Sequence, residues 1–147
     1  MFFASVNSHS NNLGNMISKY RFNYEKIIFI SNINFNWSEK MTNPTKTAEF
    51  YIDKKSVIKI NNYIYYWSLG NVLKTLKDAP NLKSSISYNK VDCNDMGYQT
   101  VIFIAFTENM GNGEIIFHDS ENPDKEEDKR FDPESSVAYR LHDKLCN

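Results

Sequence analysis

The chain has 147 residues, the length of one domain with a single hydrophobic core. Its 17 basic and 18 acidic residues leave a formal net charge of −1, which argues against a nucleic-acid-binding protein because that class concentrates positive charge on one face. No stretch approaches the roughly eighteen consecutive apolar residues of a membrane-spanning helix. Aromatic residues make up 14% of the chain, which favours strands over a helical bundle.

Residues 1–34 are rich in serine and asparagine and show no sustained hydrophobic period. Lys19, Arg21 and Lys26 precede the short apolar run Ile27–Ile30, as in the start of a signal peptide. Asparagines then interrupt the run, and no small-x-small cleavage site follows. We expect residues 1–34 to be a poorly ordered segment, either a degraded signal peptide or a polar tail, and residues 35–147 to be the ordered domain.

The first half of that domain consists of short alternating runs that predict strands. In residues 35–41, alternation would place Phe35, Trp37, Glu39 and Met41 on one face. Further strands are expected over three later runs, with Asn61 and Asn62 as a two-residue hairpin loop before the last of them. These runs are residues 48–53, 57–60 and 63–69. The last is aromatic on both faces, which is typical of a central strand.

The second half gives a less uniform pattern. Residues 70–82 have the apolar spacing of a short helix but lead into a turn around Pro80. Residues 84–91 alternate again, and residues 98–107 contain the longest apolar run, which indicates a strand buried on both faces. Residues 109–113 are the strongest hairpin turn signal, with an Asn-Gly pair at Asn112-Gly113, and residues 114–117 are expected to form the return strand.

The chain ends in a charged loop and a predicted helix. Residues 119–130 show no hydrophobic period. Asp132-Pro133-Glu134 has the residues of a helix start, with Asp132 as the cap, and apolar residues recur every four positions from Val137. The sequence therefore predicts an α+β, mainly β fold: an antiparallel meander sheet of about six or seven strands with a C-terminal helix packed on it.

No residue pattern indicates catalysis, a cofactor or a metal. His9, His118 and His142 lack ligand spacing, and we interpret them as solvated or locally hydrogen-bonded. The acidic run 119–128 offers oxygen atoms for calcium, but it lacks the spacing and glycine of an EF-hand loop. A solvated, mobile loop is our interpretation of it. A hydrolase-type or calcium-dependent site in residues 119–130, beside His118, is the alternative.

The two cysteines could be bonded to each other or free, and the two cases imply different cellular compartments. Cys93 follows a predicted strand, and Cys146 lies at the end of the predicted helix. A bond between them would tie the helix to the sheet and imply export, whereas two free thiols would favour a cytosolic protein. Their spacing alone leaves both alternatives open.

Short motifs along the chain, in their order and spacing, resemble the surface-adhesin protein E family of bacterial envelope proteins. The residues that carry the resemblance are Trp37, Phe50–Asp53, Ser56–Lys59, Tyr66–Leu69, Ser85-Ile86, Val91–Cys93, Met110–Gly113, Pro133–Ser136, Leu141 and Cys146.

The resemblance implies a structural disulfide between Cys93 and Cys146 that holds the terminal helix against the sheet. It also implies an exported, non-enzymatic protein of the periplasm or cell surface, homodimerisation, and binding of a protein ligand such as an extracellular-matrix or plasma protein. No binding residue transfers from the family. A structural or small-ligand-binding envelope domain without an adhesin role is the alternative, since a fold does not fix a function.

Overall fold

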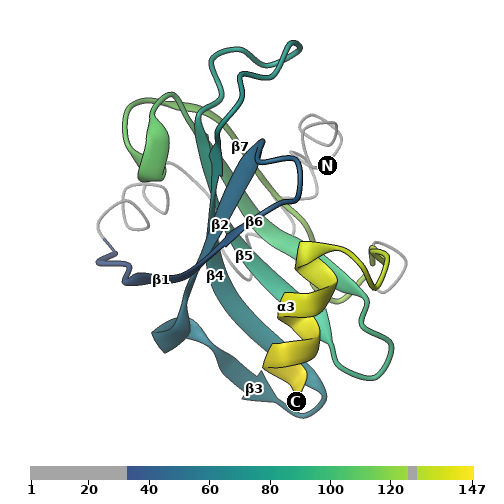
Figure 1. The fold of residues 1–147 in the computed structure, drawn as a ribbon. Coiled ribbons are helices and arrows are strands. Elements are labelled where there is room, and N and C mark those ends of the chain that lie inside the picture. The colour runs from purple at the N-terminus through teal and green to yellow at the C-terminus, as the bar shows by residue number, and fades with distance from the viewer. Residues whose placement is uncertain (1–32, 126–128) are drawn as a thin grey trace.

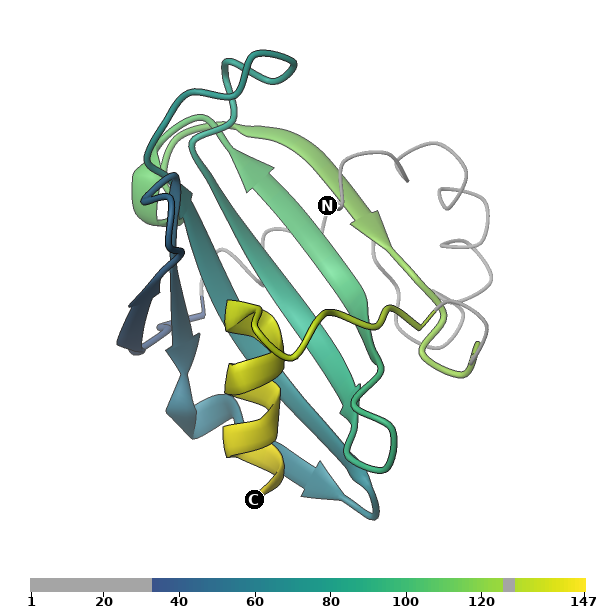
Figure 2. The same ribbon diagram turned by 45° about the vertical axis from the view of Figure 1, so that its right-hand side comes forward.

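The computed structural model of the chain describes residues 33–125 and 129–147, which form a seven-stranded antiparallel sheet with a C-terminal helix lying on one face (Figures 1 and 2). This is the predicted fold class. The strands, short 3-10 helices (η) and α-helix are, in chain order, β1 (Trp37–Thr42), β2 (Ala48–Asp53), η2 (Lys54–Ser56), β3 (Ile58–Ile60), β4 (Tyr63–Val72), β5 (Ser84–Asp92), β6 (Tyr98–Phe106), η3 (Asn109–Gly111), β7 (Ile115–Ser120) and α3 (Val137–Cys146).

The strand order β1-β2-β4-β5-β6-β7 departs from a simple meander only at β3. Strand β2 pairs with residues 68–72 of β4, and β3 pairs with residues 63–65 of the same strand. The turn between β2 and β3 is fixed by Asp53, whose carboxylate accepts a hydrogen bond from the Lys55 amide at 3.0 Å. β2 and β3 therefore both pair with the long strand β4. Strand β3 ends at the predicted Asn61-Asn62 loop, where Asn61 has φ 55°.

The hydrophobic core occupies both faces of the sheet. On the helix-covered face it comprises Ile52, Ile64, Tyr66, Val91, Tyr98 and Leu141. On the opposite face the buried cluster comprises Leu69, Ile86, Ile104 and Phe106. Strand β6 has buried residues at both odd and even positions, so its long apolar run indeed marks burial on both sides.

The expected alternation in residues 35–41 is wrong. Strand β1 begins at Trp37, and its pairing with β2 shifts register between Ser38 and Met41. Glu39 lies inside this bulge with φ 52°. Because a bulge inserts an extra residue on one strand, the two-residue period does not continue through it, and Glu39 is not an ordinary member of one strand face.

Residues 70–82 form no helix. Strand β4 continues to Val72, with Gly70 and Asn71 paired to Ser85 and Ser84 of β5. The following residues form a loop that contains one bridge, between Leu76 and Ala79. Pairing with β5 gives the backbone of Gly70 and Asn71 hydrogen-bond partners in the sheet, whereas a short isolated helix is only marginally stable in water. Strand pairing therefore overrides the helical spacing of the apolar residues.

The connection between β6 and β7 is a hairpin, but Asn112-Gly113 is not its two-residue turn. That turn type needs positive φ at both central residues, whereas Asn112 has φ −102°. The positive φ values fall instead at Met110, Gly111 and Gly113. The loop spans Thr107 to Glu114. The Thr107 amide donates a hydrogen bond to the Glu114 carbonyl at 3.0 Å.

The expected solvated loop 119–130 begins as strand. Strand β7 extends to Ser120, and Asp119, Ser120 and Glu121 are buried. At the other end, Lys129 forms an ion pair with Asp92 at 2.7 Å, and Arg130 bridges to Tyr98 through the backbone. Pairing with the edge of β6 draws these residues out of solvent, so the interpretation of a wholly solvated, mobile loop is wrong.

Helix α3 begins later than its Pro133 motif predicts. Ser136 is the cap, and its hydroxyl accepts from the Tyr139 amide at 3.0 Å. The expected cap, Asp132, instead accepts a hydrogen bond from the Tyr98 hydroxyl at 3.0 Å. The Asp132 carboxylate thus bonds to Tyr98, a residue distant in sequence, and does not cap the helix as the local pattern predicted.

Candidate binding surfaces

The two cysteines form a disulfide. Cys93 directly follows β5 and Cys146 is the last residue of α3, with an S–S distance of 2.01 Å and a Cα–Cα distance of 5.6 Å. Both pack against the core cluster that contains Ile52 and Ile64. The disulfide therefore joins the end of the helix to a turn at the edge of the core, as the resemblance implied, and the alternative of two free thiols is wrong.

Strand β3 is an exposed sheet edge. Its three residues are all exposed, and the side chains of Ile58 and Ile60 retain 51% and 54% of their accessible surface. Within residues 33–125 and 129–147, no strand pairs with the outer side of β3. In an antiparallel pair alternate residues direct their backbone groups away from the partner, so this edge presents unpaired backbone groups beside two apolar side chains.

A row of aromatic side chains continues from β3 across the same face of the sheet. Ile58 lies opposite Tyr65 and Ile60 opposite Tyr63. The Tyr65 and Trp67 rings contact Tyr88, at centroid distances of 6.1 and 4.9 Å. These four aromatic residues, Tyr63, Tyr65, Trp67 and Tyr88, are only half-buried. Together with Ile58 and Ile60 they form what we call the β3 surface.

Lys90 supports one end of the β3 surface. Its ammonium lies 4.2 Å from the centroid of the Tyr63 ring and donates to the Pro123 carbonyl at 2.7 Å. Lys90 itself is buried. The ring is thus held between the sheet and a cation of fixed position, which reduces the conformational entropy that binding would cost.

The opposite face of the sheet, under α3, holds a buried histidine. His142 is 2% exposed, and its Nε2 lies 2.7 Å from the Tyr66 hydroxyl. Burial lowers the pKa of His142 to about 4, against a weaker opposing effect of Asp132, so the ring is neutral at pH 7 and shares a hydrogen bond with the Tyr66 hydroxyl. Burial likewise raises the pKa of Tyr66 and of Tyr98. The structure confirms a locally hydrogen-bonded histidine here and excludes a solvated one.

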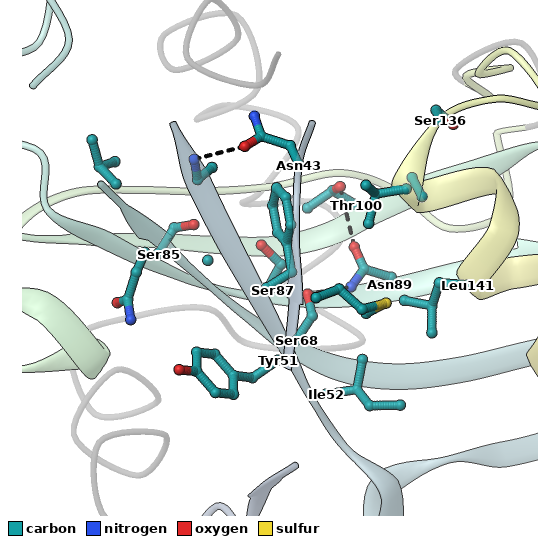
Figure 3. A pocket seen from close by; sticks show the side chains of 18 of the residues that line it. Asn43, Tyr51, Ile52, Ser68, Ser85, Ser87, Asn89, Thr100, Ser136 and Leu141 are labelled. Carbon is teal, nitrogen blue, oxygen red and sulfur yellow. Dashed lines mark hydrogen bonds between the residues drawn. The ribbon is translucent and has the colours of Figure 1, made fainter. Parts of the chain in front are cut away.

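A pocket of about 580 Å³ lies beside this histidine, between the start of α3, the β1–β2 hairpin and the sheet. On the sheet side, Asn89 donates to Ser68 at 2.9 Å and accepts from Thr100 at 3.3 Å. Figure 3 shows these residues with Ser87 on the sheet side, and Ser136 and Leu141 on the helix side. We call this space the helix-side pocket.

Sequence reasoning missed the helix-side pocket, although a signal was present. Ser68 and Gly70 alternate in β4, and Ser85, Ser87 and Asn89 alternate in β5. Such small or polar residues occupy a face where a large apolar side chain would normally fill the core. The pattern marks a hollow only once the register Ser68 opposite Ser87 is known.

Among residues 118–125 and 129–130, the structure does not assemble the alternative site proposed for residues 119–130. His118 is exposed on β7 and Asp119 is buried beside it; neighbouring residues of a strand point to opposite faces. In the part of the chain that the structure describes, no group of three His, Cys, Asp or Glu side chains could hold a metal ion. His9 lies outside the described residues.

No helix of residues 33–125 and 129–147 is long and apolar enough to cross a membrane.

Comparison with known proteins gives one family. The model of the family described as surface-adhesin protein E matches residues 37–147. Solved structures of Haemophilus influenzae protein E are similar to the chain. One, a second crystal form, is 18% identical, with a TM-score of 0.49 over 74% of this chain and 87% of that one. Another is 16% identical, with a TM-score of 0.49 over 78% and 86%. No curated protein matches the chain.

Proposed function

The chain belongs to the surface-adhesin protein E family, and from that premise we propose that it is an exported, non-enzymatic bacterial envelope protein that binds another protein through the β3 surface. Residues 35–147 are the binding domain, and the segment before them is a degraded signal peptide or a polar tail. The protein resides in the periplasm or on the cell surface. Its partner is an extracellular-matrix or plasma protein.

The observation that carries this proposal is the exposed edge of β3. A short edge strand that carries two half-exposed isoleucines, Ile58 and Ile60, is a site where an extended segment of another protein adds a strand. Backbone hydrogen bonds to the edge would supply affinity, and apolar side chains of the added strand would contact the isoleucines.

The aromatic row extends that contact across the sheet. Tyrosine and tryptophan are the residues that most often dominate protein interfaces, because they bury large areas while losing few rotatable bonds. Trp67 and Tyr88 already pack against neighbouring rings in tilted arrangements, so they need no reordering on binding. The β3 surface thus combines an open edge with preorganised aromatic side chains.

A pair of matched double variants tests the proposal. We expect Ile58→Lys with Ile60→Lys to weaken binding at least tenfold, because two charges would lose their water at the interface. The readout is surface plasmon resonance against purified extracellular-matrix and plasma proteins, immobilised one by one. The matched control is Leu73→Lys with Ile116→Lys, which adds the same charge at two other exposed apolar residues.

Binding that survives in the β3 double variant and not in the control would place the interface elsewhere and overturn the role of the β3 surface. Failure of the wild-type protein to bind any member of the panel would overturn the adhesin function itself. Thermal unfolding of both variants checks that the fold is retained.

The same edge suits a second copy of the chain, since two β3 strands can pair across a twofold axis. Light scattering over a range of protein concentrations measures this. If the protein forms a dimer through β3, the β3 double variant becomes monomeric while the control variant stays dimeric.

A further inference from the structure

We propose that the helix-side pocket binds a small uncharged amphiphile, with an alkyl or similarly apolar body and one hydroxyl, carbonyl or amide group. The pocket lies on the face of the sheet opposite the β3 surface, because Ser68 and Tyr66 alternate in β4 with Tyr65 and Trp67. The inference therefore does not depend on the proposed protein-binding function.

The walls of the pocket suit an apolar body. The apolar side chains that line it come from β1, β2, β4, the loop before β5 and the helix: Met41, Phe50, Ile52, Val72, Leu82 and Leu141. A volume of about 580 Å³ falls in the range of sites that take drug-sized molecules. An apolar ligand would cover this surface and remove it from water, which is favourable in proportion to the area buried.

The hollow arises because small residues occupy the middle of the sheet. A Cβ atom added at Gly70 would lie 3.5 Å from the Phe50 ring and 3.5 Å from the Ser85 hydroxyl, which is ordinary contact. Neither the backbone nor a close approach of other atoms therefore requires glycine at this position. The Phe50 ring lies next to Gly70, and beside it the small side chains of Ser68, Ser85 and Ser87 leave space that a large core side chain would normally fill.

Ser87 offers a polar group in the pocket wall. The residue is 9% exposed and lines the pocket, and among the described residues its hydroxyl makes no hydrogen bond. The neighbouring polar groups differ, because Ser68, Asn89 and Thr100 bond to one another. The Ser87 hydroxyl therefore remains available on the pocket wall, and a ligand hydroxyl, carbonyl or amide could form a hydrogen bond with it.

The pocket selects against charge. No Lys, Arg, Asp or Glu lines it, and the one histidine that does, His142, is kept neutral by its burial. A carboxylate or an ammonium group would lose its hydration there without meeting an opposite charge. An uncharged head group avoids that cost while still bonding to Ser87.

Three probes with the same ten-carbon chain test the proposal: decan-1-ol, decanoate and decylammonium. We expect decan-1-ol to bind with a dissociation constant at least tenfold lower than either charged probe, measured by calorimetry below micellar concentrations. Amide NMR shifts on binding should map to Ser68, Ser87 and Thr100. Equal or tighter binding of a charged probe, or shifts confined to the β3 surface, would overturn the proposal.

Two variants locate the site. Ser87→Ala should weaken decan-1-ol binding about fivefold and leave the melting temperature unchanged, because the hydroxyl has no protein partner to lose. Gly70→Val should weaken binding, because its side chain would narrow the pocket beside Phe50 and Ser85, and its melting temperature shows whether the fold is retained. The matched control is Ser120→Ala, which removes a buried hydroxyl that also lacks a partner but is absent from the pocket lining. Wild-type affinity in both pocket variants, or equal losses in the control, would contradict the assignment.

Discussion

His142 shows how a single side chain links the helix to the sheet. The ring is buried under α3, shares a hydrogen bond with the Tyr66 hydroxyl and contacts the ring of Tyr98, whose hydroxyl donates a hydrogen bond to Asp132. All these contacts are made by the neutral imidazole. Protonation would place a positive charge in an apolar cluster, which is why burial holds the pKa near 4.

The pH dependence of stability follows from this lowered pKa. In the unfolded chain a histidine titrates near pH 6.5, whereas folded His142 titrates near pH 4. Stability from His142 is therefore complete above pH 6.5 and is lost as the pH falls toward 4. The loss is on the order of 3 kcal/mol.

The measurement is urea unfolding of the wild type and His142→Gln at several pH values between 7 and 4. The advantage of the wild type should shrink across that range, since the variant lacks the titrating group but keeps the carboxylates. A constant difference between the two proteins would contradict a buried neutral histidine.

The position of His142 could have been predicted, whereas that of the helix cap could not. His142 lies four residues after Ala138 and three before Leu145, on the apolar side of the helix by its spacing. By contrast, Asp132-Pro133 has the residues of a helix start, but Asp132 does not cap the helix because its carboxylate accepts a hydrogen bond from Tyr98. No local pattern reveals a hydrogen bond between residues 34 positions apart.

At the scale of elements, helix α3 depends on its anchor. It has only 10 residues, which is too short for an isolated helix to be stable in water. Its apolar residues reach the core through Leu141 and Leu145, and the disulfide fixes its last residue. The cross-link spans 53 positions, so it restricts the unfolded chain considerably.

Removal of the disulfide, by Cys93→Ser with Cys146→Ser, should lower the free energy of unfolding by about 4 kcal/mol, the loop-closure contribution of a chain segment of this length. Urea unfolding of the oxidised wild type and the double variant measures the difference. Added reductant should destabilise the wild type and leave the variant unchanged. A difference below about 1 kcal/mol, where native strain offsets the entropy, would contradict an anchoring role.

The strands divide into those that alternation predicts and those that depend on pairing. β2, β5 and β6 lie where their patterns placed them, because each has a buried face or two that imposes the hydrophobic period. The bulge at Glu39 and the extension of β4 through Gly70 are set by the neighbouring strand. The pairing register depends on the sequences of both strands, so it cannot be predicted from the sequence of one strand alone.

At the scale of the whole molecule, the sheet presents different chemistry on its two faces. One face carries the exposed edge and aromatic row of the β3 surface. The other face is covered by α3 (Figure 2) and holds the buried histidine and the helix-side pocket. The family and its disulfide could be predicted from the sequence, because ordered short motifs carry them. Neither binding surface could, because each combines strands that meet only in the folded sheet.

The proposed function requires an exported, disulfide-linked envelope protein. The most direct test is intact mass spectrometry, under non-reducing conditions, of the protein recovered from periplasmic, surface and cytosolic fractions of the cells that produce it. We predict recovery from the periplasm or surface with Cys93 bonded to Cys146. Recovery from the cytosol with two free thiols would contradict both the export and the adhesin function.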